Sequence, residues 1–265
     1  MAAELGGRRV QAVIGGVQKS ATSALFHALR AHRGMAPART KEVHYFDREQ
    51  GVDWSAPDYA AYHAEFPDRP GLWLEATPIY IFWPPSIARM RAYSPALRQI
   101  YLFRDPIERC FSHWCWEYAR QAELLDFPAA IEAEPARLAA AAPLDDQRRV
   151  VTYQARGLYA GQVERLLAHF PREQLLFLSQ AELRTQPLAT LRRVTDFLEI
   201  DAILTPPAIR NPRPKRDYPS RLTAGMVERL QPVFRDDLRR FADLTGLDVQ
   251  SWLTLRGPSA LPEAG

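Results

Sequence analysis

The chain has 265 residues, a formal net charge of +3 and a hydrophobic content of 47%, which are ordinary values for a globular protein. This small charge does not by itself indicate a nucleic-acid partner. No apolar run reaches membrane-spanning length and the N-terminus lacks a secretory pattern, so we expect a soluble cytoplasmic protein without a membrane span. The two cysteines suit neither a disulfide framework nor a zinc site, and the wealth of arginine and alanine is typical of a high-GC bacterial genome.

Predicted strands alternate with predicted helices along most of the chain. Short apolar runs that end in glycine, proline or charged residues predict strands at residues 10–14, 72–75, 97–103 and 175–178. Apolar residues at helical spacing predict helices at residues 22–32, 106–120, 157–170, 188–198 and 222–244, the last kinked at Pro232. Asp105 and Pro106 fit the N-cap and the first position of the second helix. This alternation predicts an α/β fold with a central parallel sheet flanked by helices, in which ligands bind at the carboxyl ends of the strands.

Three segments fall outside this pattern. Residues 126–149 are rich in alanine and proline and lack the periodicity of a core helix, so we expect a surface helical insert or lid. A basic, proline-studded loop follows between Pro206 and Pro219. The tail over residues 257–265 should be loose. We therefore expect one domain over residues 1–256, followed by a flexible tail.

A glycine-rich turn joins the first predicted strand to its helix and holds one of only three lysines in the chain. It reads Gly15-Gly16-Val17-Gln18-Lys19-Ser20-Ala21-Thr22-Ser23. Glycines let the backbone approach an anion, and N–H groups at the start of the helix point towards it. Lys19 adds a compact positive charge. The turn predicts a phosphate site, although a helix N-cap with a solvated lysine explains the same residues, and its glycine spacing departs from that of the nucleotide P-loop.

A second anion site is indicated where the third predicted strand ends. Arg104 follows that strand directly, and Ser112 lies eight residues later on the second turn of the next helix. An arginine at a strand end can hold a phosphate with two parallel hydrogen bonds. A surface pair of Arg104 with Asp105 is the simpler explanation of this segment alone. Two anion sites at two strand ends, however, are what a nucleotide with phosphate groups at both ends requires.

Several segments, in order along most of the chain, resemble motifs of the sulfotransferases that use 3′-phosphoadenosine 5′-phosphosulfate (PAPS). The likeness is greatest to the branch of heparan sulfate sulfotransferases and bacterial carbohydrate or natural-product sulfotransferases. The segments that carry it are residues 16–25, Lys41-Glu42-Val43-His44-Tyr45-Phe46-Asp47, Glu75-Ala76-Thr77-Pro78-Ile79-Tyr80, residues 103–112, Arg156-Gly157-Leu158-Tyr159 and Lys215-Arg216-Asp217-Tyr218-Pro219.

The resemblance implies a P-loop-NTPase-like domain and an in-line transfer of the sulfuryl group of PAPS to an acceptor hydroxyl, without a metal. It implies that Lys19 neutralises the departing phosphate and that Glu42 takes the proton of the acceptor. The product would be 3′-phosphoadenosine 5′-phosphate (PAP). The implied nucleotide contacts are Gly16, Gln18, Lys19, Ser20, Ala21, Thr22, Ser23, Arg104, Ser112, Tyr159, Lys215 and Arg216.

The base and the acceptor site remain open between alternatives. Residues 42 and 44 face the same way in an extended segment, so His44 is a second candidate for the base, or simply a packed histidine. Glu75, Thr77 and Tyr80 are candidates for acceptor binding, although Glu75 also fits a buried structural carboxylate. The acceptor would be a hydroxyl of a small molecule, a glycan or a secondary metabolite.

The chain departs from the family pattern at three points. Ala21 replaces a glycine of the phosphosulfate loop, and Ala76 replaces a lysine that the heparan branch carries between the glutamate and the threonine. The late cysteine pair of the animal enzymes is missing, as expected for a cytoplasmic protein.

Two other function classes fit parts of the sequence. A P-loop small-molecule kinase would use Lys19 on ATP and Asp105 on magnesium. A non-catalytic binder of nucleotide or RNA would use the basic loop at residues 210–221, but it would leave Glu42 and Glu75 unexplained. A homo-oligomer is also compatible with the sequence.

Overall fold

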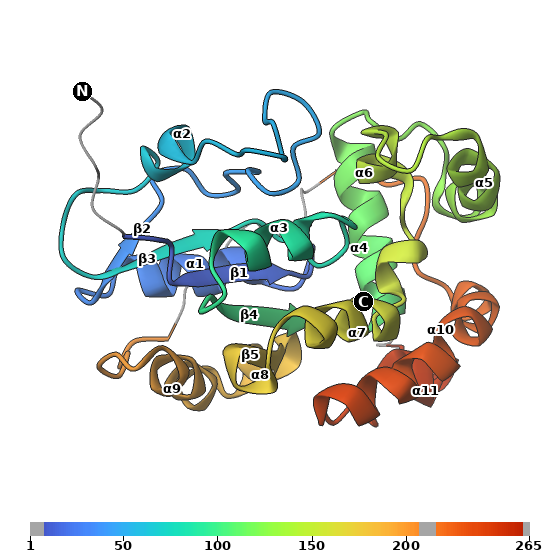
Figure 1. The fold of residues 1–265 in the computed structure, drawn as a ribbon. Coiled ribbons are helices and arrows are strands. Elements are labelled where there is room, and N and C mark those ends of the chain that lie inside the picture. The colour runs from blue at the N-terminus through green and yellow to red at the C-terminus, as the bar shows by residue number, and fades with distance from the viewer. Residues whose placement is uncertain (1–7, 207–215, 262–265) are drawn as a thin grey trace. The chain divides into compact units, whose positions relative to one another are not determined.

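The computed structural model describes residues 8–206 and 216–261, which divide into two compact units (Figure 1). The first unit contains the described residues 8–17, 21–103 and 166–206. The second contains residues 18–20, 104–165 and 216–261. None of the described helices combines the length and the apolar composition that a bilayer span needs.

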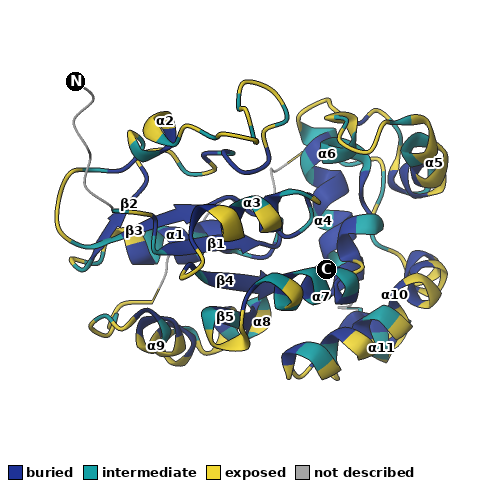
Figure 2. Ribbon diagram, viewed as in Figure 1, coloured by how far each residue is buried: buried dark blue, intermediate teal, exposed yellow. Residues whose placement is uncertain are grey.

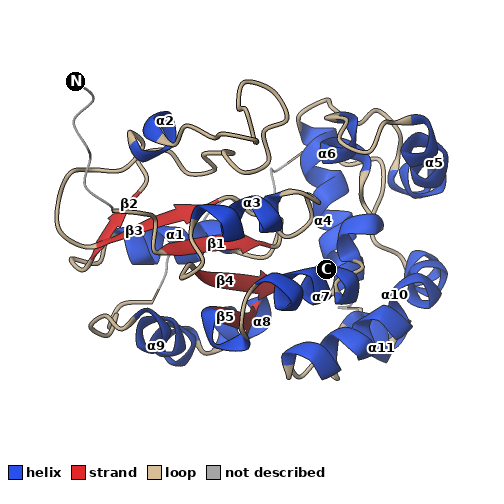
Figure 3. Ribbon diagram, in the orientation of Figure 1, coloured by secondary structure: helices blue, strands red, loops and turns tan. Residues whose placement is uncertain are grey.

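A five-stranded parallel sheet in the order β2-β3-β1-β4-β5 forms the centre of the first unit (Figure 3). Its strands are β1 (Ala12–Gly16), β2 (Met35–Pro37), β3 (Leu72–Ala76), β4 (Arg98–Phe103) and β5 (Leu175–Ser179). Four of them confirm the predicted strands. The edge strand β2 was missed because its three residues, one of them proline, form too short an apolar run. The sheet confirms the α/β class and places β1 between β3 and β4.

One face of this sheet carries the apolar core of the first unit. Alternate strand residues point to it, and Figure 2 shows the strands as buried. They pack against α1 (Thr22–Arg30), α8 (Gln180–Thr185) and α9 (Pro187–Leu198). The buried members of the cluster are Ala12, Ile14, Leu25, Phe26, Leu29, Met35, Leu74, Ala76, Ile100, Leu102, Leu178, Leu183, Leu191, Val194 and Leu198.

The opposite face of the sheet is more polar and carries the residues that matter for the site. Glu75 of β3 lies on this face, one residue from the core residues Leu74 and Ala76. It contacts Tyr62 of the short helix α2 (Ala60–His63), which in turn lies against Tyr93 of α3 (Ser86–Tyr93). Aromatic rings thus surround a buried carboxylate.

The second unit is helical. Its helices are α4 (Pro106–Ala119), α5 (Phe127–Ala140), α6 (Gln147–Val151), α10 (Ala224–Thr245), α11 (Leu253–Arg256) and the start of α7 (Ala160–His169). It also contains the 3-10 turns Ala155–Gly157 and Pro258–Ala260. A further 3-10 turn, Arg172–Gln174, belongs to the first unit and precedes β5. Asp105 caps α4, as predicted: its Oδ1 accepts from the Glu108 N–H at 2.9 Å and its Oδ2 from the Thr254 N–H at 2.7 Å. Pro232 lies inside α10.

Two predictions for this unit need correction. The insert is helical, but α5 has one face in a core: Phe127, Ala130 and Ile131 are buried in the second unit, while other residues of the helix are exposed. The buried face was missed in the sequence because its few apolar residues are close together and surrounded by alanines, so no helical periodicity stands out. In the described part of the tail, Pro258–Ala260 form a 3-10 turn and Leu261 packs against the same core, while residues 262–265 lie outside the described residues.

Candidate active site

The segment from the end of β1 to the start of α1, here called the donor loop (residues 15–23), has a backbone that only certain side chains fit. A Cβ on Gly15 would lie 2.7 Å from the Tyr101 ring, and one on Gly16 would lie 2.7 Å from Ile81. Lys19 and Ala21 have φ of 71° and 65°, in the left-handed region. Such a φ costs about 1–3 kcal/mol on a residue other than glycine and is concentrated at functional sites. The loop is therefore shaped by tight packing and held in a strained form.

The polar groups of the donor loop are arranged as an anion site requires. Ser20 is fully buried, and its Oγ has no hydrogen-bond partner among the described residues. An unsatisfied buried hydroxyl is unfavourable, and an anionic oxygen would supply its missing partner. Thr22 and Ser23 follow, nearly buried, at the start of α1, which no side chain of the described residues caps. The residues present thus fit a phosphate group.

Lys19 lies over an aromatic ring of the same unit. Its Nζ is 4.4 Å from the centroid of the Trp116 ring, on α4. Ammonium groups are attracted to the face of an indole ring at this distance. Trp116 is one helical turn after Ser112, so the lysine faces the side of α4 on which that serine lies.

Further positive charge surrounds the donor loop in the second unit. Arg156 is nearly buried, and its Nη1 donates to Oε1 of Gln18 at 2.7 Å. Burial, with the charges of Arg156, Arg109 and Lys19, lowers the pKa of His113 well below its usual value. Burial also raises the pKa of Glu117, although Arg120, Arg156 and Lys19 oppose that rise. The effects of three cations on one histidine indicate a positive field near Lys19.

The predicted second anion site has its arginine where expected. Arg104 follows the last residue of β4, and its Nε donates to Oε2 of Glu108 at 2.9 Å. Its two terminal nitrogens have no hydrogen-bond partner among the described residues. Ser112 is partly exposed on α4, two turns into the helix. Strands β1 and β4 are neighbours, so both predicted anion segments follow adjacent strands.

Two predicted nucleotide contacts are placed differently, and a third cannot be placed. Tyr159 is fully buried, and its hydroxyl donates to the backbone oxygen of Arg104 at 2.9 Å. The tyrosine therefore holds the turn at Arg104. Arg216 donates to the backbone oxygens of Tyr118 and Ala119 at the end of α4 and lies over the Tyr118 ring. Lys215 lies outside the described residues.

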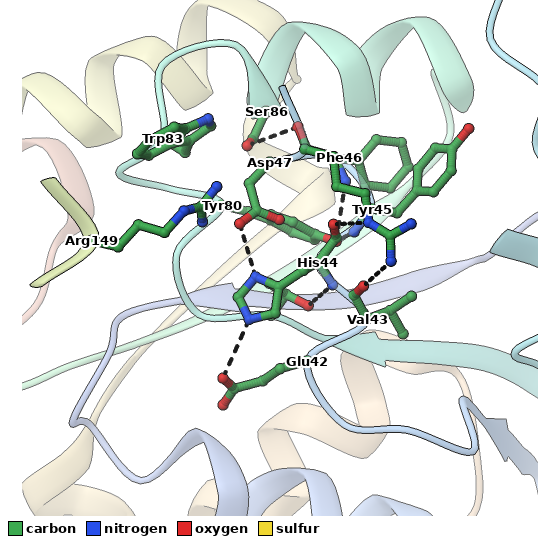
Figure 4. Close-up of polar contacts among 12 residues, drawn as sticks. Glu42, Val43, His44, Tyr45, Phe46, Asp47, Tyr80, Trp83, Ser86 and Arg149 are labelled. Atoms are coloured by element: carbon green, nitrogen blue, oxygen red, sulfur yellow. Dashed lines mark hydrogen bonds and ion pairs between the residues drawn. The ribbon is translucent and has the colours of Figure 1, made fainter. Parts of the chain in front are cut away.

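The segment Lys41–Asp47, here called the base turn, brings two carboxylates to one imidazole (Figure 4). Nδ1 of His44 lies 2.8 Å from Oδ2 of Asp47, and its Nε2 lies 3.7 Å from Oε2 of Glu42. Lys41 pairs with the other oxygen of Glu42. The backbone of this segment is not extended, since Glu42 and His44 have φ of 64° and 55°. The side chains of Glu42 and His44 still meet, with one left-handed residue on each side of Val43.

The charges of the base turn shift each other's pKa. Burial raises the pKa of Glu42, but the hydrogen bond with His44 and the charge of Lys41 outweigh burial and lower it to about 2. Burial lowers the pKa of His44, but its hydrogen bonds with Asp47 and Glu42 outweigh burial and raise it to about 9. At neutral pH Glu42 is therefore a carboxylate and His44 an imidazolium. A side-chain exposure of 43% leaves Glu42 accessible to a reactant.

The three predicted acceptor contacts are all internal. Glu75, Thr77 and Tyr80 are 0% exposed. Thr77 and Tyr80 donate their hydroxyl protons to Oε1 of Glu75 at 2.6 and 2.5 Å. Their burial is contrary to direct contact with an acceptor and agrees with the alternative of a structural carboxylate for Glu75.

Sequence reasoning missed several residues of this arrangement. Asp47 and Arg156 lie in the segments that were singled out, and their charges next to His44 and Gln18 were the available signal. Trp116 could have been found from its position one turn after Ser112. Tyr62 gave no signal, because nothing local connects residue 62 with the strand that ends at Ala76.

Asp105, the magnesium ligand of the kinase alternative, is committed elsewhere. Both of its carboxylate oxygens accept backbone N–H groups, and it is nearly buried. Within the described ranges, no cluster of three or more histidine, cysteine or acidic side chains could hold a metal ion.

Comparisons with known proteins identify relatives of the chain. Residues 9–207 match the family described as "Sulfotransferase domain". Mouse heparan sulfate glucosamine 3-O-sulfotransferase 3B1 is 33% identical over 199 residues, which cover 74% of this chain and 47% of that protein. Human heparan sulfate glucosamine 3-O-sulfotransferase 6 is 30% identical over 262 residues, covering 90% and 72%. A solved sulfotransferase from Alicyclobacillus acidocaldarius superimposes with a TM-score of 0.77 at 26% identity, covering 93% and 99%. The chain spans about half the length of the mouse relative.

Proposed function

Because the chain belongs to the family of PAPS-dependent sulfotransferases, we propose that it transfers a sulfuryl group from PAPS to a hydroxyl of a glycan or small-molecule acceptor. Heparan sulfate is the acceptor in the names of the curated relatives. The buried Ala76 stands where that branch carries a lysine, so we propose an acceptor that is not heparan sulfate. A sugar or metabolite hydroxyl meets the chemical requirement.

The donor would be held by the groups around the donor loop. Lys19 would neutralise charge on the departing phosphate, and the buried Ser20 hydroxyl would donate to the 5′-phosphate. The terminal nitrogens of Arg104, with the Ser112 hydroxyl, would bind the 3′-phosphate. Gln18, which accepts a hydrogen bond from Arg156, would fix the position of the donor loop.

Glu42 is our choice for the base. An imidazolium that already donates towards Asp47 and Glu42 has no lone pair with which to accept a proton. Glu42 is ionised and exposed, so its carboxylate can take the acceptor's proton. The acceptor oxygen then forms its bond to sulfur while the bond from sulfur to the bridging oxygen breaks, and PAP leaves with that electron pair. His44 keeps its proton throughout and orients the carboxylate.

The base turn is the observation that carries this proposal. Two charged groups, Lys41 and His44, contact Glu42, and the backbone that presents it is strained. A turn that served only stability would not require two left-handed residues, since each costs about 1–3 kcal/mol.

A thermal-shift titration tests the donor class directly. PAP at 100 times its Kd should add about 2.7 kcal/mol to the apparent free energy of unfolding. ATP and AMP, each lacking a 3′-phosphate, should stabilise the protein far less. Equal stabilisation by ATP would favour the kinase alternative and refute the nucleotide assignment.

A transfer assay tests the reaction itself. The purified chain would be incubated with sulfur-labelled PAPS and a panel of desulfated glycans, phenols and aliphatic alcohols. We expect label in at least one acceptor class, with Glu42→Gln as the blank. Label that accumulates equally with the Glu42→Gln variant would contradict the proposed mechanism.

A further inference from the structure

We propose that Glu75 is a positioning residue, which acts through three hydroxyl groups to hold the turn that carries Glu42 and His44. This inference rests on the function proposed above. Glu75 cannot touch a substrate, because it is 0% exposed in the first unit. Its influence must pass through the groups that it binds.

Glu75 collects the protons of three hydroxyl groups. Oε1 accepts from Thr77 and Tyr80, and Oε2 accepts from Tyr62. A hydroxyl has only one proton to donate, while its oxygen keeps lone pairs that can accept. The carboxylate therefore orients each of these hydroxyls with its proton towards Glu75 and its lone pairs away from it.

The lone pairs of Thr77 and Tyr80 accept hydrogen bonds from backbone N–H groups of the base turn. Oγ1 of Thr77 accepts from the His44 N–H at 3.3 Å. The Tyr80 hydroxyl accepts from the N–H groups of Tyr45 and Phe46 at 3.0 and 3.4 Å. With the Glu42 N–H donating to the Ala76 backbone oxygen at 3.0 Å, four N–H groups of the turn are bound to the end of β3 and the residues after it.

This attachment explains how two left-handed residues are maintained. Glu42 and His44 persist in that conformation only because the surrounding structure holds them. Two of the hydrogen-bonded N–H groups belong to these same residues. If Glu75 did not bind the hydroxyl protons, Thr77 and Tyr80 could rotate and direct a proton at an N–H, which would repel the turn.

The third hydroxyl extends the attachment to the far end of the following loop. Tyr62 lies on α2, after residues 48–59, and its ring stacks on that of Tyr45 with centroids 4.6 Å apart. The same carboxylate thus fixes the segment that precedes this loop and the helix that follows it. Burial raises the pKa of Glu75, and the three hydroxyl hydrogen bonds oppose that rise.

Paired substitutions at Thr77 test the inference. Thr77→Val keeps the shape but removes both hydrogen bonds, whereas Thr77→Ser keeps the hydroxyl. We expect Thr77→Val to lower kcat about tenfold to hundredfold with the KM for PAPS unchanged, as displacement of a catalytic group does. Thr77→Ser should restore kcat to within about threefold of the unsubstituted protein, a margin consistent with the retained hydrogen bonds.

A second measurement does not depend on turnover. The pKa of the His44 imidazole, followed by NMR, should be about 9 in the unsubstituted protein. In Thr77→Val it should fall towards the ordinary value of about 6.5, because the turn no longer holds His44 between Asp47 and Glu42. If the protein neither binds PAP nor transfers sulfate, the proposed function fails, yet this titration still tests the positioning role.

A matched control separates positioning from a general loss of stability. Tyr153 of the second unit also donates its hydroxyl proton to a carboxylate, Glu123, at 2.9 Å, and is fully buried. Tyr153→Phe should leave kcat and the His44 titration unchanged. If Thr77→Val does not fold, Tyr80→Phe takes its place with the same expectations. Unchanged kcat and unchanged His44 pKa in the folded variant would overturn the inference, as would equal losses in Tyr153→Phe.

Discussion

The base turn and the donor loop are both strained, but their polar groups are in opposite states. In the base turn every charge is already matched: Lys41 and His44 face Glu42, and Asp47 faces His44. In the donor loop the Ser20 hydroxyl has no partner among the described residues, and Lys19 lies on an aromatic ring. The first region is organised before any reactant arrives, whereas the second has groups that an anion would complete. The contrast agrees with the roles proposed above, proton transfer for the base turn and anion binding for the donor loop.

Glu42→Gln should produce the largest effect, and it should affect the base turn without affecting ligand binding at the donor loop. Removal of a general base typically lowers the rate about 10²–10⁴-fold. We expect that loss in kcat, with the PAP-induced thermal shift retained. A variant that lost PAP binding in proportion to its activity would place Glu42 with the donor groups instead.

Lys19→Ala should affect the donor loop and leave the base turn unchanged. Loss of one group that stabilises developing charge lowers kcat about 10²–10³-fold. The His44 titration of this variant should match that of the unsubstituted protein. Single-turnover kinetics would measure the loss, and a rate within about threefold of the original would contradict the role of Lys19.

Asp47→Asn should change the pH dependence. The pKa of His44 is raised to about 9, so stabilisation from its pairing is present below about 6.5 and is lost as the pH rises through about 9. The lowered pKa of Glu42, about 2, gives stabilisation that is present above about 4.5 and is lost as the pH falls through about 2. Activity should therefore fall above about pH 9, and Asp47→Asn should move this alkaline limb to lower pH. Profiles of kcat/KM would show it, and coincident alkaline limbs would refute the coupling.

Ser20→Ala should weaken ligand binding while stabilising the free protein. The buried hydroxyl has no partner among the described residues, so its removal should add about 1 kcal/mol to the free energy of unfolding. The same substitution should weaken PAP about tenfold, the value of one hydrogen bond to a charged group. Urea unfolding and calorimetry would measure the two changes. A loss of stability in the free protein would show that the hydroxyl is satisfied internally.

Ala21→Gly should have the smallest effect. The left-handed φ of 65° is unfavourable for alanine and neutral for glycine, so the variant should be more stable by up to about 1 kcal/mol. Thermal unfolding would detect the gain. Ala24→Gly, inside α1, serves as the control. It should lower the free energy of unfolding by about 1 kcal/mol, because glycine is unfavourable within a helix.

Local features of the chain could be predicted from its sequence, and long-range ones could not. The strand before Gly16, the helix after Ala21 and the Asp105 cap follow from periodicity and from residues within one turn. The links from Thr77 to His44 and from Tyr62 to Glu75 join segments whose proximity depends on how β3 pairs within the sheet. The left-handed φ of Glu42 had no signal either, since glutamate does not mark such a conformation. The burial of Glu75, Thr77 and Tyr80 could not be predicted for the same reason, because it depends on how distant segments pack around the end of β3.

The contact between Lys19 and Trp116 provides a spectroscopic probe of the donor loop. The chain contains only three lysines, and Lys41 is paired with Glu42. Mild reductive methylation with carbon-13 would therefore give few dimethyl-lysine resonances. One of them would be shifted by the ring current of the indole beneath it. As the ammonium leaves that ring for an incoming anion, its resonance should return to the random-coil position and report occupancy without any substrate being labelled.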